Sequence, residues 1–196
     1  MNNVWFSARR KERGRSQCND DVLTLGRGTA QLGVLMDGAA GAKTIATKCC
    51  TLIRQLYGKI PLIPLTTIVK QLDTVCLGHG VESTIVAAVV EDGWLSGFSC
   101  GDSVCAIVRD GKLSVATSVS KPRLGTGHPD VQAFSVPVRR YDTVCLYSDG
   151  LCLPPWKIAS VVMNNSLRPD SLPHVLLDAE KSFEDDVSVL TFCVRL

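Results

Sequence analysis

The chain has 196 residues, which fits one domain large enough to bury a hydrophobic core. Hydrophobic residues make up 45% and charged residues 20%, a composition that excludes an intrinsically disordered chain. The formal net charge of +2 is too small to indicate binding to nucleic acid or to an acidic membrane surface.

The first half of the chain predicts three strands followed by two helices. Five basic residues follow the first strand: Arg9, Arg10, Lys11, Arg13 and Arg15. Such a run is typical of a solvated strand end, and the alternative is a role in binding an anion. The helices are predicted from apolar residues that recur at helical spacing, and Gly58 and Pro61 stop the first of them. The predicted strands are Val4–Ser7, Val22–Leu25 and Gln31–Met36, and the helical stripes run from Ile45 to Leu56 and from Leu65 to Cys76.

The second half predicts mostly strands, separated by turn signals such as Asp110-Gly111. The run Ile85–Val90 is apolar without alternation, which indicates a strand covered on both faces. The predicted strands are Ser83–Val90, Trp94–Cys100, Val104–Val108, Leu113–Thr117, Val131–Val138, Thr143–Tyr147 and Val187–Val194, and the predicted helices are Trp156–Met163 and Ser171–Glu180.

This order of elements predicts an α+β fold over residues 1–196 as one domain. Antiparallel strands in hairpins, together with two helix pairs, favour two mainly antiparallel sheets flanked by helices on each side. The expected architecture is a four-layer α-β-β-α sandwich.

The nine cysteines are odd in number and irregularly spaced, and they contain no C-x-x-C pair. A zinc site and a secreted disulfide framework are therefore disfavoured, and we expect reduced, mostly buried thiols. The N-terminus lacks the apolar segment of a signal peptide, and no apolar run approaches the roughly eighteen residues of a membrane span. We expect a cytoplasmic protein that does not enter a membrane.

Four aspartates each lie at the boundary of an apolar strand: Asp37, Asp102, Asp149 and Asp185. A single Asp-Gly after a strand is most often an ordinary turn. Several carboxylates collected at one edge of a sandwich, however, would repel one another unless cations neutralised them. Oxygen ligands of this kind favour Mg²⁺ or Mn²⁺ over zinc.

The order and context of these segments resemble the metal-dependent protein phosphatase family of the protein phosphatase 2C type, especially its compact bacterial members. The resemblance covers nearly the whole chain and rests on six fragments in the family's order. They are Arg15-Ser-Gln-Cys-Asn-Asp20, Val34-Leu-Met-Asp37-Gly38-Ala-Ala-Gly41, Glu82-Ser-Thr84, Ser99-Cys-Gly101-Asp102-Ser103, Asp142-Thr-Val-Cys-Leu-Tyr-Ser148-Asp149-Gly150-Leu151 and Asp185-Asp186-Val-Ser188-Val.

The resemblance implies a site for two divalent cations, Mn²⁺ or Mg²⁺. Asp37 would bridge both ions, the carbonyl of Gly38 would be another ligand, and Asp149 and Asp185 would complete the site. Asp102 corresponds to the ligand of a third, weaker ion in some relatives. The implied chemistry is attack on phosphorus by hydroxide from a water that bridges the two ions.

The acid at the N-terminal side of the site has two alternatives. If Asn19 takes the position before the family's aspartate, Asp20 is the ligand and Arg15 is the arginine that grips the phosphate. A shift of one residue makes Asp20 and Asp21 the acidic pair instead. The first frame is preferred because it also places Arg15.

The implied function is a protein serine/threonine phosphatase that acts in signalling as a monomer on a phosphorylated protein. Ala39, Ala40 and Val104 depart from the family pattern, and no histidine can be placed as a general acid. These departures motivate the alternative of a catalytically weak pseudo-phosphatase that serves as a regulatory binding module. A third reading is a structural domain that binds cations without turnover.

Overall fold

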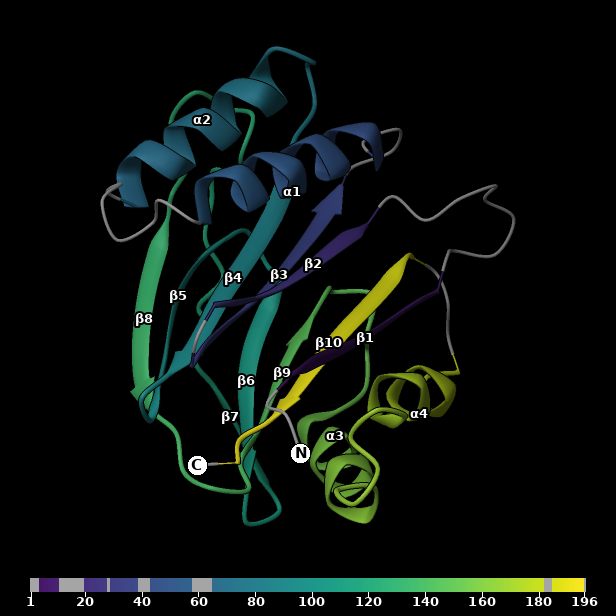
Figure 1. Ribbon diagram of the computed structural model, residues 1–196. Helices are drawn as coiled ribbons and strands as arrows, with labels where there is room; N and C mark the ends of the chain where they lie inside the picture. The colour runs from purple at the N-terminus through teal and green to yellow at the C-terminus, as the bar shows by residue number, and fades with distance from the viewer. Residues whose placement is uncertain are drawn as a thin grey trace.

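Two five-stranded antiparallel sheets form the centre of the molecule (Figure 1). The computed structural model describes residues 4–10, 20–27, 29–38, 43–57, 65–181 and 185–195. The first sheet has the strand order β1 (Trp5–Arg10), β10 (Val187–Cys193), β9 (Thr143–Tyr147), β6 (Val104–Arg109) and β7 (Lys112–Val115). The second has the order β2 (Asp21–Arg27), β3 (Ala30–Gly38), β4 (Ser83–Glu91), β5 (Trp94–Cys100) and β8 (Gln132–Pro137).

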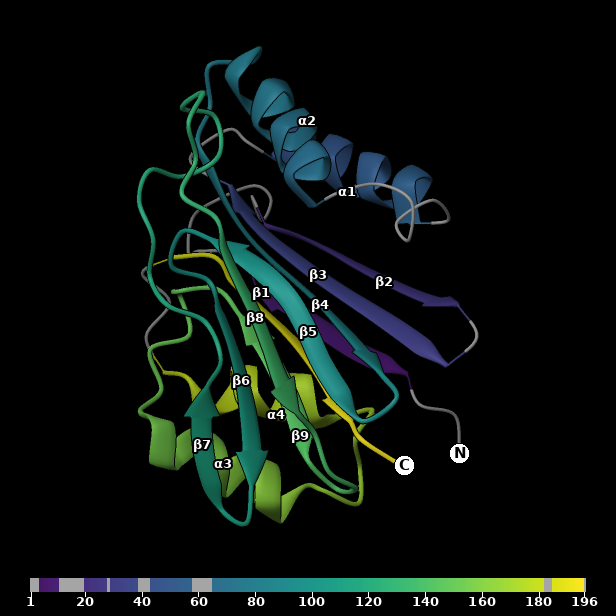
Figure 2. The ribbon, with the colours of Figure 1, turned by 90° about the vertical axis from the view of Figure 1, so that its left-hand side faces the viewer.

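A helix pair covers the outer face of each sheet, so the molecule has four layers (Figure 2). Helices α1 (Lys43–Tyr57) and α2 (Leu65–Leu77) share a hydrophobic cluster with the second sheet. Helices α3 (Pro155–Asn164) and α4 (Leu172–Ala179) share one with the first sheet. A third cluster fills the space between the sheets. None of the helices within the described ranges is long and apolar enough to cross a bilayer.

The side chains of β3 alternate between two hydrophobic cores, one under the helix pair and one between the sheets. Successive side chains of a strand point to opposite faces of the sheet. Val34 and Met36 therefore pack with the helix pair, while Leu35 packs between the sheets. Neighbouring β4 is buried along most of its length, which confirms the prediction of a strand covered on both faces.

The predicted four-layer sandwich is confirmed, and the strands and helices appear in the predicted order. The largest difference is in β1, which was expected at Val4–Ser7 and instead extends into the basic run as far as Arg10. The strand continues there because Arg9 and Arg10 pair with Ser188 and Val187 of β10, and both cations also have acidic partners. Arg9 pairs with Asp21 at 2.9 Å, and Arg10 pairs with Asp178 of α4 at 2.5 Å.

None of the eight cysteines within the described ranges forms a disulfide with another of them, and six are buried. The sulfur atoms of Cys49 and Cys76 approach each other to 4.0 Å without a bond. Burial raises the pKa of Cys100 to about 11 and that of Cys50 to about 12. The expected mostly buried thiols are therefore present, and burial keeps Cys50 and Cys100 poorly ionised near neutral pH.

Thiol labelling of the native protein should single out one described cysteine. Cys152 is exposed, whereas a buried thiol that stays protonated is a poor nucleophile. Cys18 lies outside the described residues, so the test uses a Cys18→Ser background. With an aromatic disulfide reagent at pH 8, we expect one fast thiol that the further substitution Cys152→Ser removes. Fast labelling of several further thiols in the folded protein would contradict the burial of the six buried cysteines.

Candidate functional site

Four strand ends meet at one end of the sandwich: the starts of β2 and β10 and the ends of β3 and β9 (Figure 1). In the antiparallel pairing of β2 with β3, Asp21 lies opposite Met36, so Asp20 comes next to Asp37. In the other sheet, the Ser148 amide donates to the Ser188 carbonyl at 3.1 Å. This bond places Asp149 beside the start of β10.

The alternation of side chains decides which carboxylates face each other. Val22 and Leu35 belong to the core between the sheets. Asp20 and Asp37 lie two residues from Val22 and Leu35 respectively, so they face the same space between the sheets. Asp21 faces the opposite way, towards α1.

Asp20 is fully buried, and neither of its carboxylate oxygens has a hydrogen-bond partner. Burial raises its pKa to about 6, and the charge of Asp186 adds to this effect. The nearby side chains of Ser188, Asp37 and Ser148 oppose this rise in pKa, although no hydrogen bond to either carboxylate oxygen is present. An ionised carboxylate in such a position is costly unless another positive charge is present.

Asp37 stands between two other acids. Burial is the largest cause that raises its pKa to about 9, followed by the charges of Asp20 and Asp149. Three carboxylates from β2, β3 and the loop after β9 therefore lie within electrostatic reach of one another. The backbone here is fixed, because the Ser83 hydroxyl donates to the Asp37 carbonyl at 2.8 Å.

Gly150 lets the loop that carries Asp149 lie against the start of β10. A Cβ atom at this position would come within 2.2 Å of the Asp186 carbonyl oxygen, closer than any side chain tolerates. The Asp-Gly pair after β9 is thus more than a turn signal. It brings Asp149 next to the backbone of Asp186.

Asp186, which the sequence patterns did not single out as a ligand, is buried near Asp20. It is 1% exposed, and its charge acts on Asp20. The predicted ligand Asp185 is exposed, and its Oδ1 accepts the backbone N–H of Asp186 at 2.8 Å. The alternation of β10 contained the missing signal: Val187 packs towards the helices, so Asp186, one residue earlier, faces between the sheets.

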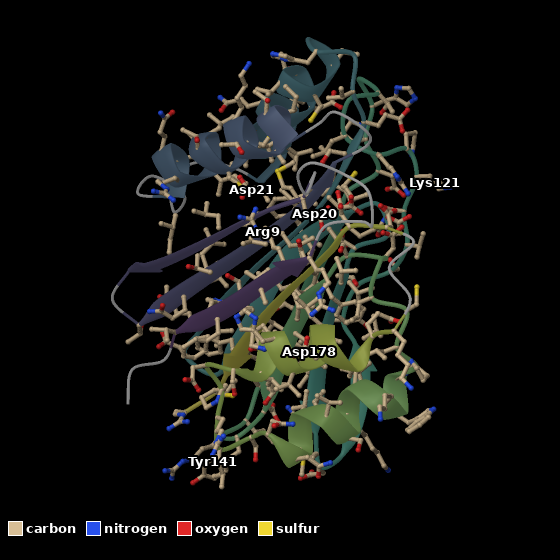
Figure 3. The ribbon with its side chains drawn as sticks, turned by 90° about the vertical axis from the view of Figure 1, so that its right-hand side faces the viewer. Arg9, Asp20, Asp21, Lys121, Tyr141 and Asp178 are labelled. Atoms are coloured by element: carbon tan, nitrogen blue, oxygen red, sulfur yellow. The ribbon has the colours of Figure 1, made fainter. Side chains whose placement is uncertain are left out.

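Asp21 already has polar partners away from this group. Its carboxylate accepts bonds from Arg9 at 2.9 Å and from the Thr47 hydroxyl of α1 at 2.8 Å. Arg9 also donates to the Asp20 carbonyl at 3.0 Å, so it ties β1 of one sheet to β2 of the other. Figure 3 shows Arg9 and Asp21 close together, with Asp20 beside them.

Asp102, the predicted ligand of a third ion, lies on the loop between β5 and β6. One of its oxygens pairs with Arg123, and the other is buried without a partner. The predicted phosphate-gripping Arg15 and the departures Ala39 and Ala40 lie outside the described residues. The three histidines are exposed: His79 contacts Lys48, and His128 and His174 lie on a loop and on α4.

The residues present fit hard divalent cations. No three His, Cys, Asp or Glu side chains in the described ranges form a complete metal-binding group, and residues 39–42 and 182–184 beside the site are outside those ranges. The unpartnered oxygens of Asp20 are nevertheless buried acceptors that need a positive charge. The described donors at this site are carboxylate oxygens, which are the ligands that Mg²⁺ and Mn²⁺ prefer.

Without added metal, the stability of the protein should fall as the pH rises from about 4 to about 9. The pKa values of Asp20 and Asp37 in the folded protein, about 6 and about 9, lie above the ordinary aspartate value of 3.8. The folded state therefore keeps protons that the unfolded chain has released, and it loses this advantage as the pH passes each folded value. Denaturant unfolding in EDTA at several pH values in this range measures how the free energy of unfolding changes with pH. Asp37→Asn should make this dependence weaker. A stability that increases over the range would contradict the raised values.

No protein-family model matches the sequence. No curated protein matches it either. Solved structures do match over nearly the whole chain. The serine/threonine phosphatase of S. agalactiae aligns with a TM-score of 0.82 at 16% identity, covering 97% of this chain and 99% of that one.

Two further neighbours have the same architecture. The serine/threonine phosphatase PstP/Ppp of Mycobacterium tuberculosis aligns with a TM-score of 0.77 at 19% identity, covering 98% of this chain and all (100%) of the other. RsbX in complex with magnesium aligns with a TM-score of 0.78 at 15% identity, covering 99% and 98%. This chain therefore has the fold of the bacterial serine/threonine phosphatases of the protein phosphatase 2C type.

Proposed function

We propose that this chain is a metal-dependent protein phosphatase that hydrolyses phosphoserine or phosphothreonine. The observation that carries the proposal is Asp20, a fully buried carboxylate whose two oxygens have no hydrogen-bond partner and which faces Asp37. A fold shared with phosphatases adds support but does not by itself establish an activity. The chemistry of the site has to carry the argument.

The proposed ligands of two Mn²⁺ or Mg²⁺ ions are Asp20, Asp37, the Gly38 carbonyl, Asp149 and a carboxylate of the Asp185-Asp186 pair. Asp37 is the candidate for the bridging position, since its neighbours Asp20 and Asp149 come from different sheets. Within the pair, Asp186 is favoured by its burial and by its effect on Asp20.

Two such cations supply hydroxide near neutral pH and neutralise charge that gathers on the phosphoryl oxygens. The protein's part is to fix the carboxylates in place. Ser83 holds the backbone of Asp37, and Arg9 holds the backbone of Asp20. Arg15 stays a proposed phosphate-binding residue on the strength of the resemblance alone.

The test is release of phosphate from phosphoserine and phosphothreonine peptides in the presence of Mn²⁺, with and without EDTA. We expect turnover that EDTA abolishes and that is much weaker on a matched phosphotyrosine peptide. Metal-dependent thermal stabilisation without turnover would instead indicate a pseudo-phosphatase or a structural cation-binding domain. A monomeric, cytoplasmic protein acting on a phosphorylated protein partner is part of the same proposal.

A further inference from the structure

A second charged group lies at the same end of the sandwich, on the segment that connects β7 to β8. Arg123 pairs with Asp102, and the two side chains are 31% and 23% exposed. Within the described parts of the chain, no other hydrogen bond of this guanidinium is present. Most of its donors are therefore available to a ligand that arrives from solvent.

The sheet register places this pair close to Asp37. Gly38 of β3 lies opposite Ser83 of β4, and Ser83 in turn pairs with Leu124. Two strand spacings separate Gly38 from Leu124, about 10 Å. A side chain as long as that of Arg123 spans much of this distance, so its guanidinium can reach a ligand held beside Asp37.

The backbone that directly follows Arg123 is held in place. Leu124 is fully buried and exchanges two backbone bonds of 3.2 Å with Ser83. The next residue, Gly125, donates to the Asp73 carboxylate at 2.7 Å. Because the chain is fixed here and Asp102 holds the side chain, little conformational freedom remains to be lost when the guanidinium binds a ligand.

Asp102, unlike Asp20, forms an ion pair with an arginine. Its carboxylate already has a permanent cation, since an arginine is always protonated in proteins. Asp102 thus has less need of a metal ion than the unpaired Asp20. The planar guanidinium of Arg123 suits two oxygens of a phosphoryl group, which it can grip with parallel hydrogen bonds.

We propose that Arg123 binds the phosphoryl group of the substrate and that Asp102 is the positioning residue that holds its guanidinium. The inference rests on the proposed phosphatase function, because the phosphoryl group has to sit beside Asp37. It gives Asp102 a role that does not require a third metal ion.

The experiment measures the binding of inorganic phosphate to the Mg²⁺-loaded protein by calorimetry, together with competitive inhibition by phosphate of aryl phosphate hydrolysis. Arg123→Ala should weaken phosphate binding and raise KM about tenfold, as expected for loss of charge-assisted hydrogen bonds. Arg123→Lys should recover part of the affinity. Asp102→Asn should weaken phosphate binding less, about threefold, and leave the Mg²⁺ dependence unchanged.

Lys121 provides the matched control. It carries the same charge on the same segment, is exposed, and lies at the periphery of the molecule (Figure 3). Lys121→Ala should leave phosphate binding unchanged, and thermal unfolding should show that every variant is folded. The assignment is overturned if Arg123→Ala binds phosphate like the wild type, if the wild type binds none, or if Asp102→Asn shifts the Mg²⁺ dependence instead. Phosphate binding that depends on Arg123 without turnover would refute the proposed function alone.

Discussion

Replacing Asp37 by alanine is expected to lower metal-dependent hydrolysis of an aryl phosphate about a hundredfold or more, a loss of about 2.7 kcal/mol in transition-state stabilisation. Asp37 has the central place among the carboxylates, since both Asp20 and Asp149 act on it electrostatically. Its removal takes away the proposed ligand whose charge is coupled to both of the other acids. Initial rates with Mn²⁺ at saturating substrate measure the effect.

Asp178 of α4 provides a control for the loss of an aspartate. Its carboxylate is 70% exposed and pairs with Arg10 on the outside of the molecule (Figure 3). An exposed ion pair of this kind contributes about 1 kcal/mol or less to stability, so Asp178→Ala should keep wild-type rates. Wild-type turnover no faster than that of Asp37→Ala would support the reading of a regulatory module that has lost its activity.

Asp20→Asn should stabilise the metal-free protein and weaken the metal-loaded one. Asparagine keeps the size of the side chain but removes a fully buried charge whose oxygens have no partner. In EDTA, we expect the free energy of unfolding to rise by about 1–3 kcal/mol. For a chain of this length, each 1 kcal/mol corresponds to roughly 2–4 °C in Tm.

With Mn²⁺, the wild type should be more stable than Asp20→Asn, the reverse of the order expected in EDTA. The reason is that a cation stabilises only the folded state that binds it. The wild type should gain stability on adding metal, and Asp20→Asn should gain much less. Scanning calorimetry measures the Tm of both proteins, each with EDTA and with Mn²⁺. Asp178→Asn is the matched control. A variant that is less stable than the wild type in EDTA would show that Asp20 has a structural role.

The sequence predicted the layers because hydrophobic periodicity is a local property. The spacing of Ile45, Cys49, Leu52 and Leu56 determines a helix face, and the unbroken apolar run of β4 determines a strand buried on both sides. These patterns specify which face of each helix or strand is buried. Two helix pairs and a set of antiparallel strands can bury all of these apolar faces in only a few arrangements. Strand ends are less local: β1 extends to Arg10 because it pairs there with Val187 of β10, which lies far along the chain.

The sequence predicted that several aspartates lie close together, but it did not predict which of them face each other. Asp-Gly pairs after apolar strands marked Asp37 and Asp149, and the charge of Asp149 helps to raise the pKa of Asp37. The choice between Asp20 and Asp21 as the residue facing Asp37 stayed open at the level of sequence. The register of β2 on β3 and the contact of Asp21 with Thr47 decide it, and both depend on where α1 lies.

The sequence by itself determined the element types, their order and the sandwich, since each depends on which residues avoid water. Only the tertiary structure decided that Asp20 faces Asp37, that Asp186 is buried where Asp185 is exposed, and that Arg123 pairs with Asp102. The reason is physical: charge effects depend on distances in space and on burial. Those quantities are fixed only when strands from two sheets come together at one end.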